Sequence, residues 1–171
     1  WILKKFYEEN LFYEGTRVVP YCPHCGTGLA THEVAQDYQS DTALTCYVPF
    51  KKKNEDVYFL AWTTTPWTLL ANVALCVNPD VTYALVESKG TKLILAEALV
   101  KAVLGEESEI LETFKGKTLE NTEYEQLIPS LKVEGKAFIV TCAEYVTTED
   151  GTGVVHIAPA FGADDAEVCR E

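Results

Sequence analysis

Three consecutive threonines follow an apolar run in the segment Ala61-Trp-Thr-Thr-Thr-Pro-Trp-Thr-Leu-Leu-Ala-Asn72. Threonine hydroxyls both donate and accept hydrogen bonds, and Pro66 removes a backbone donor and fixes φ where a strand would end. Hydroxyls and freed backbone groups at a strand end can bind a small polar ligand or position a water molecule. A structural interpretation stays open beside this one, because threonine is also a good strand former.

A second segment, Asp150 to Asp165, combines close-approach glycines, a histidine and two carboxylates. The glycines of Gly151-Thr-Gly153 let the backbone approach another group closely. His156 lies within an apolar strand, where a packed core residue is the plainer interpretation. The adjacent pair Asp164-Asp165 follows a glycine turn and could serve as a helix cap or as a ligand-binding pair. The spacing matches neither a Ser-His-Asp order nor a dinucleotide fingerprint.

A third segment, Cys22-Pro-His-Cys25, is half of a tetrahedral zinc site, and a second pair of ligands would be needed to complete it. His24 and His32 could supply further nitrogens. The flanking prolines and glycines do not provide the strand and helix that a thioredoxin-type redox motif requires. The segment therefore indicates a metal half-site rather than a redox centre.

Apolar spacing predicts the elements that must position these residues. A short amphipathic helix is expected within residues 1–14, ended by Gly15, and a loop over 18–26 ends in a tight turn at the two cysteines. A helix over 96–104 ends at Gly105, and another opens near 164–170. Strands are expected at 44–50, 57–63, 81–86, 92–95, 137–143 and 154–158, with turns at 78–80 and 89–90. The pattern predicts a mixed α/β fold with a mostly antiparallel, barrel-like β core and flanking helices.

Composition bounds the function. The 171 residues suffice for one domain with a hydrophobic core, and a hydrophobic share of 47% is not that of a disordered chain. No apolar run reaches 18 residues, and the first residues resemble no secretory signal. The absence of methionine suggests a piece of a longer protein. Four of the six cysteines stand singly in apolar segments, which favours buried thiols in a reducing compartment such as the cytoplasm over a disulfide framework.

The formal net charge of −12 bears on partners. A protein that holds nucleic acid by charge alone should be basic, so any RNA contact here must be local.

Taken together, Trp62-Thr-Thr-Thr-Pro-Trp67-Thr-Leu and Gly151-Thr-Gly-x-x-His156-x-Ala-Pro-x-x-Gly-x-Asp-Asp165 closely resemble the two signature regions of the isoleucyl-tRNA synthetase editing domain, connective peptide 1. Pro20-Tyr-Cys-Pro-x-Cys25-Gly-Thr-x-Leu-x-x-His32-Glu-Val-Ala35 is similar to the stretch by which that domain leaves the synthetic core. The valyl and leucyl relatives normally follow Thr-Thr with Arg-Pro and lack this histidine. Leu70 departs from the family, which usually has proline there.

The resemblance implies hydrolysis of valine wrongly attached to isoleucine tRNA. Asp165 would bind the α-ammonium of the amino acid, while Thr64 and Thr65 would hold the ester and position the attacking water. Thr68 and His156 would admit valine and exclude isoleucine. The substrate-binding set implied by the family comprises Thr63, Trp67, Thr68, Asn72, His156 and Asp165, with Trp67 walling the pocket and Asn72 supporting the loop.

The resemblance also implies partners and domain organisation. The whole of 1–171 would be one editing domain within a larger synthetase, with 1–35 leading toward the synthetic core. The isolated piece is expected to be monomeric, to act without a membrane, and to contact the terminal adenosine of the tRNA and the rest of the synthetase. Editing would need no cofactor, and zinc would bind only in the complete enzyme, where cysteines beyond Glu171 complete the half-site of Cys22 and Cys25. The alternative is a zinc-knuckle structural or interaction module without hydrolase activity.

Overall fold

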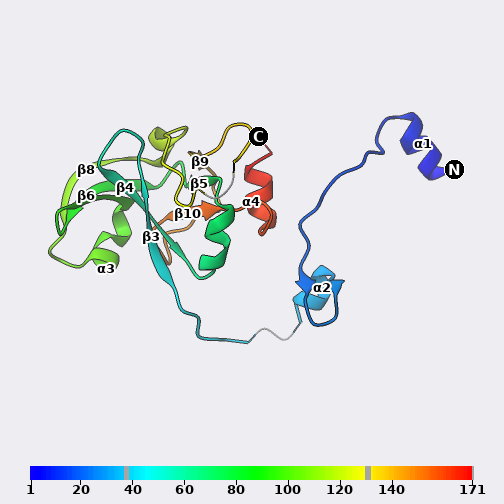
Figure 1. Cartoon of the computed structure of the whole chain (residues 1–171), viewed down its shortest axis with the longest axis horizontal. Coiled ribbons are helices and arrows are strands. Elements are labelled where there is room, and N and C mark those ends of the chain that lie inside the picture. The colour runs from blue at the N-terminus through cyan, green and yellow to red at the C-terminus, as the bar shows by residue number, and fades with distance from the viewer. Residues whose placement is uncertain (37–38, 130–131, 171) are drawn as a thin grey trace. The chain divides into compact units, whose positions relative to one another are not determined.

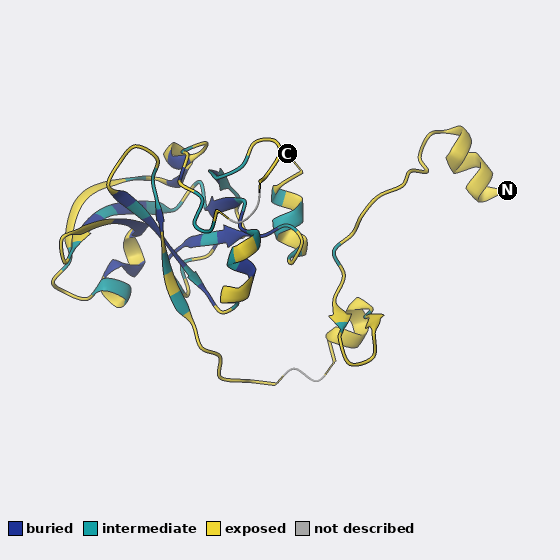
Figure 2. Cartoon of the chain, viewed as in Figure 1, coloured by how far each residue is buried: buried dark blue, intermediate teal, exposed yellow. Residues whose placement is uncertain are grey.

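The computed structural model describes residues 1–36, 39–129 and 132–170, and the chain divides into two compact units, 1–38 and 39–171 (Figure 1). The prediction of a single domain over 1–171 remains a prediction. In the first unit, the helix α1 (Ile2–Glu8) is followed by a hairpin of β1 (Tyr21–Cys22) and β2 (Thr27–Gly28), and by the one-turn helix α2 (Thr31–Val34). None of its described residues is buried (Figure 2).

The first helix ends earlier than expected. Asn10 adopts a left-handed backbone with φ of 55°, and the amide of Leu11 donates to the carbonyl of Phe6 at 2.8 Å. This is the hydrogen bond that closes a Schellman motif, and asparagine tolerates the left-handed residue such a motif needs. The prediction that Gly15 ends the helix is therefore wrong, since Asn10 does so first.

The second unit contains two sheets. A five-stranded sheet has the order β3-β4-β7-β6-β8, and a three-stranded sheet has the order β10-β5-β9. All pairs are antiparallel except β4 with β7 and β5 with β9. The strands are β3 (Cys46–Lys51), β4 (Val57–Thr63), β5 (Ala74–Val77), β6 (Thr82–Ser88), β7 (Thr91–Ala96), β8 (Glu109–Lys115), β9 (Ile139–Cys142) and β10 (Val154–Ile157). The mixed, mostly antiparallel fold is confirmed, although these described strands form open sheets and not a closed barrel.

Short helices connect and cover the sheets. The 3₁₀ helix η1 (Pro66–Ala71) links β4 to β5, η2 (Glu97–Leu99) leads into α3 (Val100–Leu104), and η3 (Gly116–Leu119) follows β8. The last helix, α4 (Ala163–Val168), lies beside β10 and β5 (Figure 1). Among the described residues, no helix has the length and apolar character needed to cross a bilayer.

The core lies between the two sheets, and strand alternation decides which side chains face it. Phe59 of β4 and Leu75 and Val154 of the small sheet are fully or almost fully buried in this cluster. Leu60, one residue along β4, instead packs with Val100 of α3 on the outer face. Counting by twos from Phe59 and Val154 places Thr63 and His156 on the inner side, facing the other sheet.

Candidate functional site

The threonine segment and the histidine strand meet at one end of the space between the sheets. β10 packs against β4, which brings His156 on β10 near the end of β4, where Thr63 lies. The helix η1, which follows Thr63, contacts His156 through Thr68. Thr68 lies within η1 and is buried, and His156 is 7% exposed. The structure thus brings together two motifs that are 88 residues apart in the chain.

A continuous chain of hydrogen bonds joins these side chains. The amide of Thr65 donates to Thr63 Oγ1 at 3.0 Å, and the two hydroxyl oxygens lie 3.3 Å apart. Thr65 Oγ1 lies 3.4 Å from Thr68 Oγ1, which in turn lies 3.1 Å from His156 Nε2. Hydroxyl groups are therefore concentrated where a regular strand pairing has ended.

The hydroxyl of Thr68 determines the histidine tautomer. Its hydrogen is donated to the carbonyl oxygen of Thr65 at 2.8 Å, so its oxygen can only accept from His156. The network therefore assigns the ring proton to Nε2 and leaves Nδ1 as an acceptor. That nitrogen is buried and has no hydrogen-bond partner in the described part of the chain. Burial lowers the pKa of His156, and the Asp165 carboxylate opposes part of this shift, so the ring is neutral at pH 7.

Asp165 lies next to the end of the same strand. Its Oδ2 accepts a hydrogen bond from the amide of Ala158 at 2.8 Å, two residues beyond His156. Helix α4 begins after Gly162 without a side-chain cap hydrogen bond, so neither Asp165 nor the exposed Asp164 acts as its cap. The carboxylate is directed back to the strand that carries the histidine.

The remaining predicted residues occupy different surroundings. Thr64 is exposed, and Trp67 is 67% exposed on η1. Asn72 is buried, but its amide groups are used within the protein: Oδ1 accepts from Tyr124 at 2.7 Å and Nδ2 donates to the carbonyl of Ala74 at 2.8 Å. These contacts support the loop, and a role of Asn72 in substrate binding stays a prediction.

Sequence reasoning missed Tyr124. Its ring packs edge-on against Phe50 and Phe138, and its hydroxyl holds Asn72. Nothing in the residues adjacent to Tyr124 signals this contact, which joins positions 52 residues apart.

The glycine segment is held by the protein itself. Gly153 has φ of 72°, and a Cβ there would lie 2.6 Å from the Cβ of Ala96. Its carbonyl accepts a hydrogen bond from the buried hydroxyl of Tyr83 at 2.6 Å, and that hydroxyl also accepts from the amide of Asn78. The close backbone approach expected at Gly153 is present, and its partner is β7 and not a ligand.

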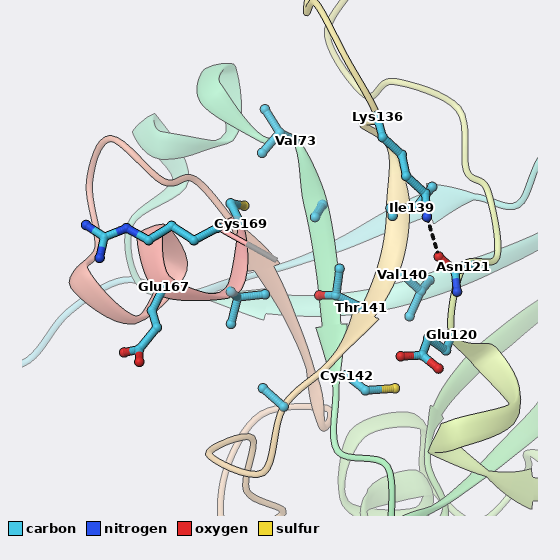
Figure 3. Close-up of a pocket in the computed structure, with 14 residues that line it drawn as sticks. Val73, Glu120, Asn121, Lys136, Ile139, Val140, Thr141, Cys142, Glu167 and Cys169 are labelled. Atoms are coloured by element: carbon cyan, nitrogen blue, oxygen red, sulfur yellow. Dashed lines mark hydrogen bonds between the residues drawn. The ribbon is translucent and has the colours of Figure 1, made fainter. Parts of the chain in front are cut away.

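A cavity of about 740 Å³ lies elsewhere, between β9 and the end of α4. Figure 3 shows Lys136 reaching Asn121, to which its ammonium donates at 2.6 Å. Burial raises the pKa of Cys142 and of Cys169, so neither thiol that lines this cavity is an activated nucleophile. None of the predicted site residues lines it, and the chemistry of the hydroxyl chain makes that chain the better candidate.

The cysteine pair forms a tight turn in the first unit. The amide of Cys25 donates to Cys22 Sγ at 3.4 Å, and this hydrogen bond lowers the pKa of the Cys22 thiol. Such a turn can present two thiolates to one metal ion. Within the described residues, no third histidine, cysteine or carboxylate joins them in a metal-binding group.

Comparison with known proteins identifies relatives that match nearly the whole chain. No protein-family model matches it. The isoleucine–tRNA ligases of Picrophilus torridus and Clostridium kluyveri are each 50% identical to it over 169 residues, which cover 98% and 99% of this chain. The chain spans about 16% of the length of these relatives.

Solved structures show the same fold. The editing domain of the P. knowlesi cytosolic leucyl-tRNA synthetase superimposes with a TM-score of 0.59 at 15% identity, covering 74% of this chain and 63% of that one. The editing domain of the P. falciparum cytosolic leucyl-tRNA synthetase gives 0.54 at 19% identity, covering 67% and 45%. The chain is therefore a member of the isoleucine–tRNA ligase family, in which it corresponds to a segment with the fold of a synthetase editing domain.

Proposed function

We propose that this chain hydrolyses valine esterified to the terminal adenosine of isoleucine tRNA. The observation that carries the proposal is the hydrogen-bonded chain from Thr63 to His156, with the Asp165 carboxylate tied to the end of the same strand. A site for an aminoacyl ester needs an anion for the α-ammonium and polar groups for the ester and water. This end of the molecule supplies both.

Each residue has a role in the reaction. Asp165 binds the ammonium through its carboxylate, a charge-assisted contact. Thr64 and Thr65 hold the ester and place a water molecule against the carbonyl carbon. Water adds to that carbon, the ester C–O bond breaks, and the proton passes to the ribose oxygen as valine departs. Positioning and preorganised hydrogen bonds carry the catalysis, and no side-chain base is invoked.

Selectivity arises from the buried end of the hydroxyl chain. Thr68 and His156 narrow the side-chain space, and the Nε2–H bond to Thr68 fixes the imidazole plane. A ring held this way cannot move aside for the extra methyl of isoleucine, which would overpack the pocket at a cost of roughly 1–3 kcal/mol. A synthetic pocket gains only about 1–3 kcal/mol from one methylene, and isoleucyl-tRNA synthetase is the standard example of an enzyme that adds a second sieve for this reason.

The net charge and the cysteines bear on how the domain meets the tRNA and on the compartment in which it acts. With a net charge of −12, the chain is suited to hold only the end of the tRNA, leaving the tRNA body to the rest of the ligase. All six cysteines, each within the described part of the chain, are free thiols, which supports a cytoplasmic location.

The experiment that tests the proposal compares two adjacent carboxylates. In the complete polypeptide that carries this sequence, Asp165→Ala should abolish deacylation of valyl-tRNA and weaken binding of a non-hydrolysable valyl-adenosine analogue. Asp164→Ala removes an exposed carboxylate from the same helical turn and should leave both unchanged. An Asp165→Ala protein that binds the analogue as tightly as the unaltered protein would refute the ammonium-binding role.

A further inference from the structure

Gly162 precedes α4, and its backbone does not explain why a glycine stands there. Its φ of −133° and ψ of 140° are those of an extended residue, which any amino acid adopts. Its carbonyl accepts the first hydrogen bond of the helix, from Ala166 at 3.0 Å, as any residue at this position would do. What a side chain at this position would meet therefore depends on the space around its α-carbon.

That space is taken by the Asp165 carboxyl group. A Cβ on Gly162 would lie 2.9 Å from Asp165 Cγ, 3.1 Å from Oδ1 and 3.2 Å from Oδ2. The contact with Cγ is shorter than a Cβ normally makes, and the contacts with the two oxygens are tight, so the carboxyl group would have to shift. An aspartate side chain is short, and its carboxylate can withdraw only by rotating about its two torsions.

Rotation moves the carboxylate relative to the amide that fixes it. Oδ2 accepts the amide hydrogen of Ala158, and Ala158 opens a turn closed by the amide of Phe161 at 2.9 Å, with Pro159 at the second position. The turn and the helix therefore hold the carboxylate from two sides. Oδ1 makes no hydrogen bond within the described residues, and remains available to a cation.

We infer that Gly162 is a positioning residue, whose missing side chain lets the Asp165 carboxylate fold back onto the Ala158 amide and present Oδ1 to the α-ammonium of the aminoacyl ester. This inference rests on the proposed function, because it assigns Gly162 a role through Asp165. It differs from a packing role in one respect. A side chain at position 162 should weaken the binding only of ligands that carry the ammonium group.

The test uses Gly162→Ala in the complete polypeptide and two non-hydrolysable adenosine amides as probes. One carries valine, and the other carries 3-methylbutanoate, which has the same branched side chain without the ammonium. We expect Gly162→Ala to weaken the binding of the valyl amide roughly 10- to 100-fold, which is the effect of losing a charge-assisted hydrogen bond. Affinity for the 3-methylbutanoyl amide should change by less than about threefold. The ratio of the two affinities does not depend on the fraction of folded protein, so it stays valid if the variant is less stable.

Two further arms separate the possible failures. In an Asp165→Ala background, Gly162→Ala should change the affinity for the valyl amide by less than about threefold, because the group it displaces is gone. Gly28→Ala is the control: a Cβ there would make only ordinary van der Waals contacts, 3.8 Å from Val19 and 3.9 Å from the carbonyl oxygen of Pro20, and both affinities should stay unchanged. Equal losses for both amides, no loss for either, or an undiminished effect in the Asp165→Ala background would overturn the positioning role. If Asp165→Ala itself leaves the affinity for the valyl amide unchanged, the proposed function fails instead.

Discussion

At the residue scale, the site depends on hydroxyl groups whose hydrogen bonds are not used by the sheet. Strand β4 ends at Thr63, before Pro66 begins η1, and the Thr65 hydroxyl lies 3.3 Å from Thr63 Oγ1 and 3.4 Å from Thr68 Oγ1. Both distances are long for hydroxyl hydrogen bonds. The hydroxyl is therefore only weakly held within the protein, so that a substrate oxygen or a water molecule can compete for it.

Replacing Thr64 and Thr65 together by alanine should lower the deacylation rate far more than it lowers stability. Losing strand propensity costs at most about 1 kcal/mol per residue, whereas one preorganised donor lost from a transition state can cost on the order of 3 kcal/mol. Single-turnover deacylation and urea unfolding measured on the same protein separate these effects. Thr113→Ala, on the exposed strand β8, is the matched control. A preserved deacylation rate with a lowered urea unfolding midpoint would show that the two threonines have a structural role only.

At the element scale, the two motifs meet because β5 and β10 pair in one sheet while β4 and β10 pack across the core. The run Val57–Thr63 matches its predicted strand, because a short run rich in β-branched and aromatic residues is a strong strand signal. Strand β5 was not predicted, since four buried residues without alternation look the same in a strand or a helix. β8 was also missed, because six of its seven residues are exposed and it gives almost no hydrophobic pattern.

The site could also be predicted only in part, because a sequence pattern reports local structure and not contacts between distant segments. The chemistry-bearing residue types stand in two local segments and are visible in the sequence. The contact between Thr68 and His156 depends on how two sheets pack, which no local pattern encodes. The amide of Ala158 and the free space at Gly162 are features of backbone geometry, and side-chain types do not reveal them.

The Tyr83 hydroxyl should prove an important support for the glycine segment beside β10. Tyr83→Phe leaves the buried carbonyl of Gly153 and the partly buried amide of Asn78 without this partner, which should cost about 1–3 kcal/mol of unfolding free energy. Urea unfolding gives the value directly. Tyr47→Phe, which removes a hydroxyl from a half-exposed residue on β3, should cost much less. Equal costs for the two variants would mean that the buried hydroxyl contributes no special stability.

At the scale of the whole molecule, the chain spans about 16% of the length of the isoleucine–tRNA ligases that it matches, and its first unit has no buried residue among those described. The cysteine turn in that unit presents two sulfur ligands, half of a tetrahedral shell. Metal binding at such a turn depends on what the rest of the polypeptide supplies.

We expect the purified chain of residues 1–171 to hold no zinc tightly, because two thiolates leave two positions of the metal shell to weaker ligands. Emission spectroscopy on the dialysed protein measures the metal content. Cys22→Ser is the matched comparison and should give the same low value. One zinc per chain, lost in Cys22→Ser, would show that His24, His32 or another cysteine completes the site.

The activity that we propose for this domain is removal of valine from isoleucine tRNA with isoleucine left in place. Its most direct test is the single-turnover deacylation of valyl-tRNA and isoleucyl-tRNA by the complete polypeptide, with and without His156→Ala. The unaltered protein should hydrolyse the valyl ester roughly 10- to 200-fold faster, the range that one methylene allows. His156→Ala should bring the two rates together by admitting isoleucine. Equal rates in the unaltered protein, or a discrimination that His156→Ala leaves intact, would rule out this selectivity and the role of His156 in it.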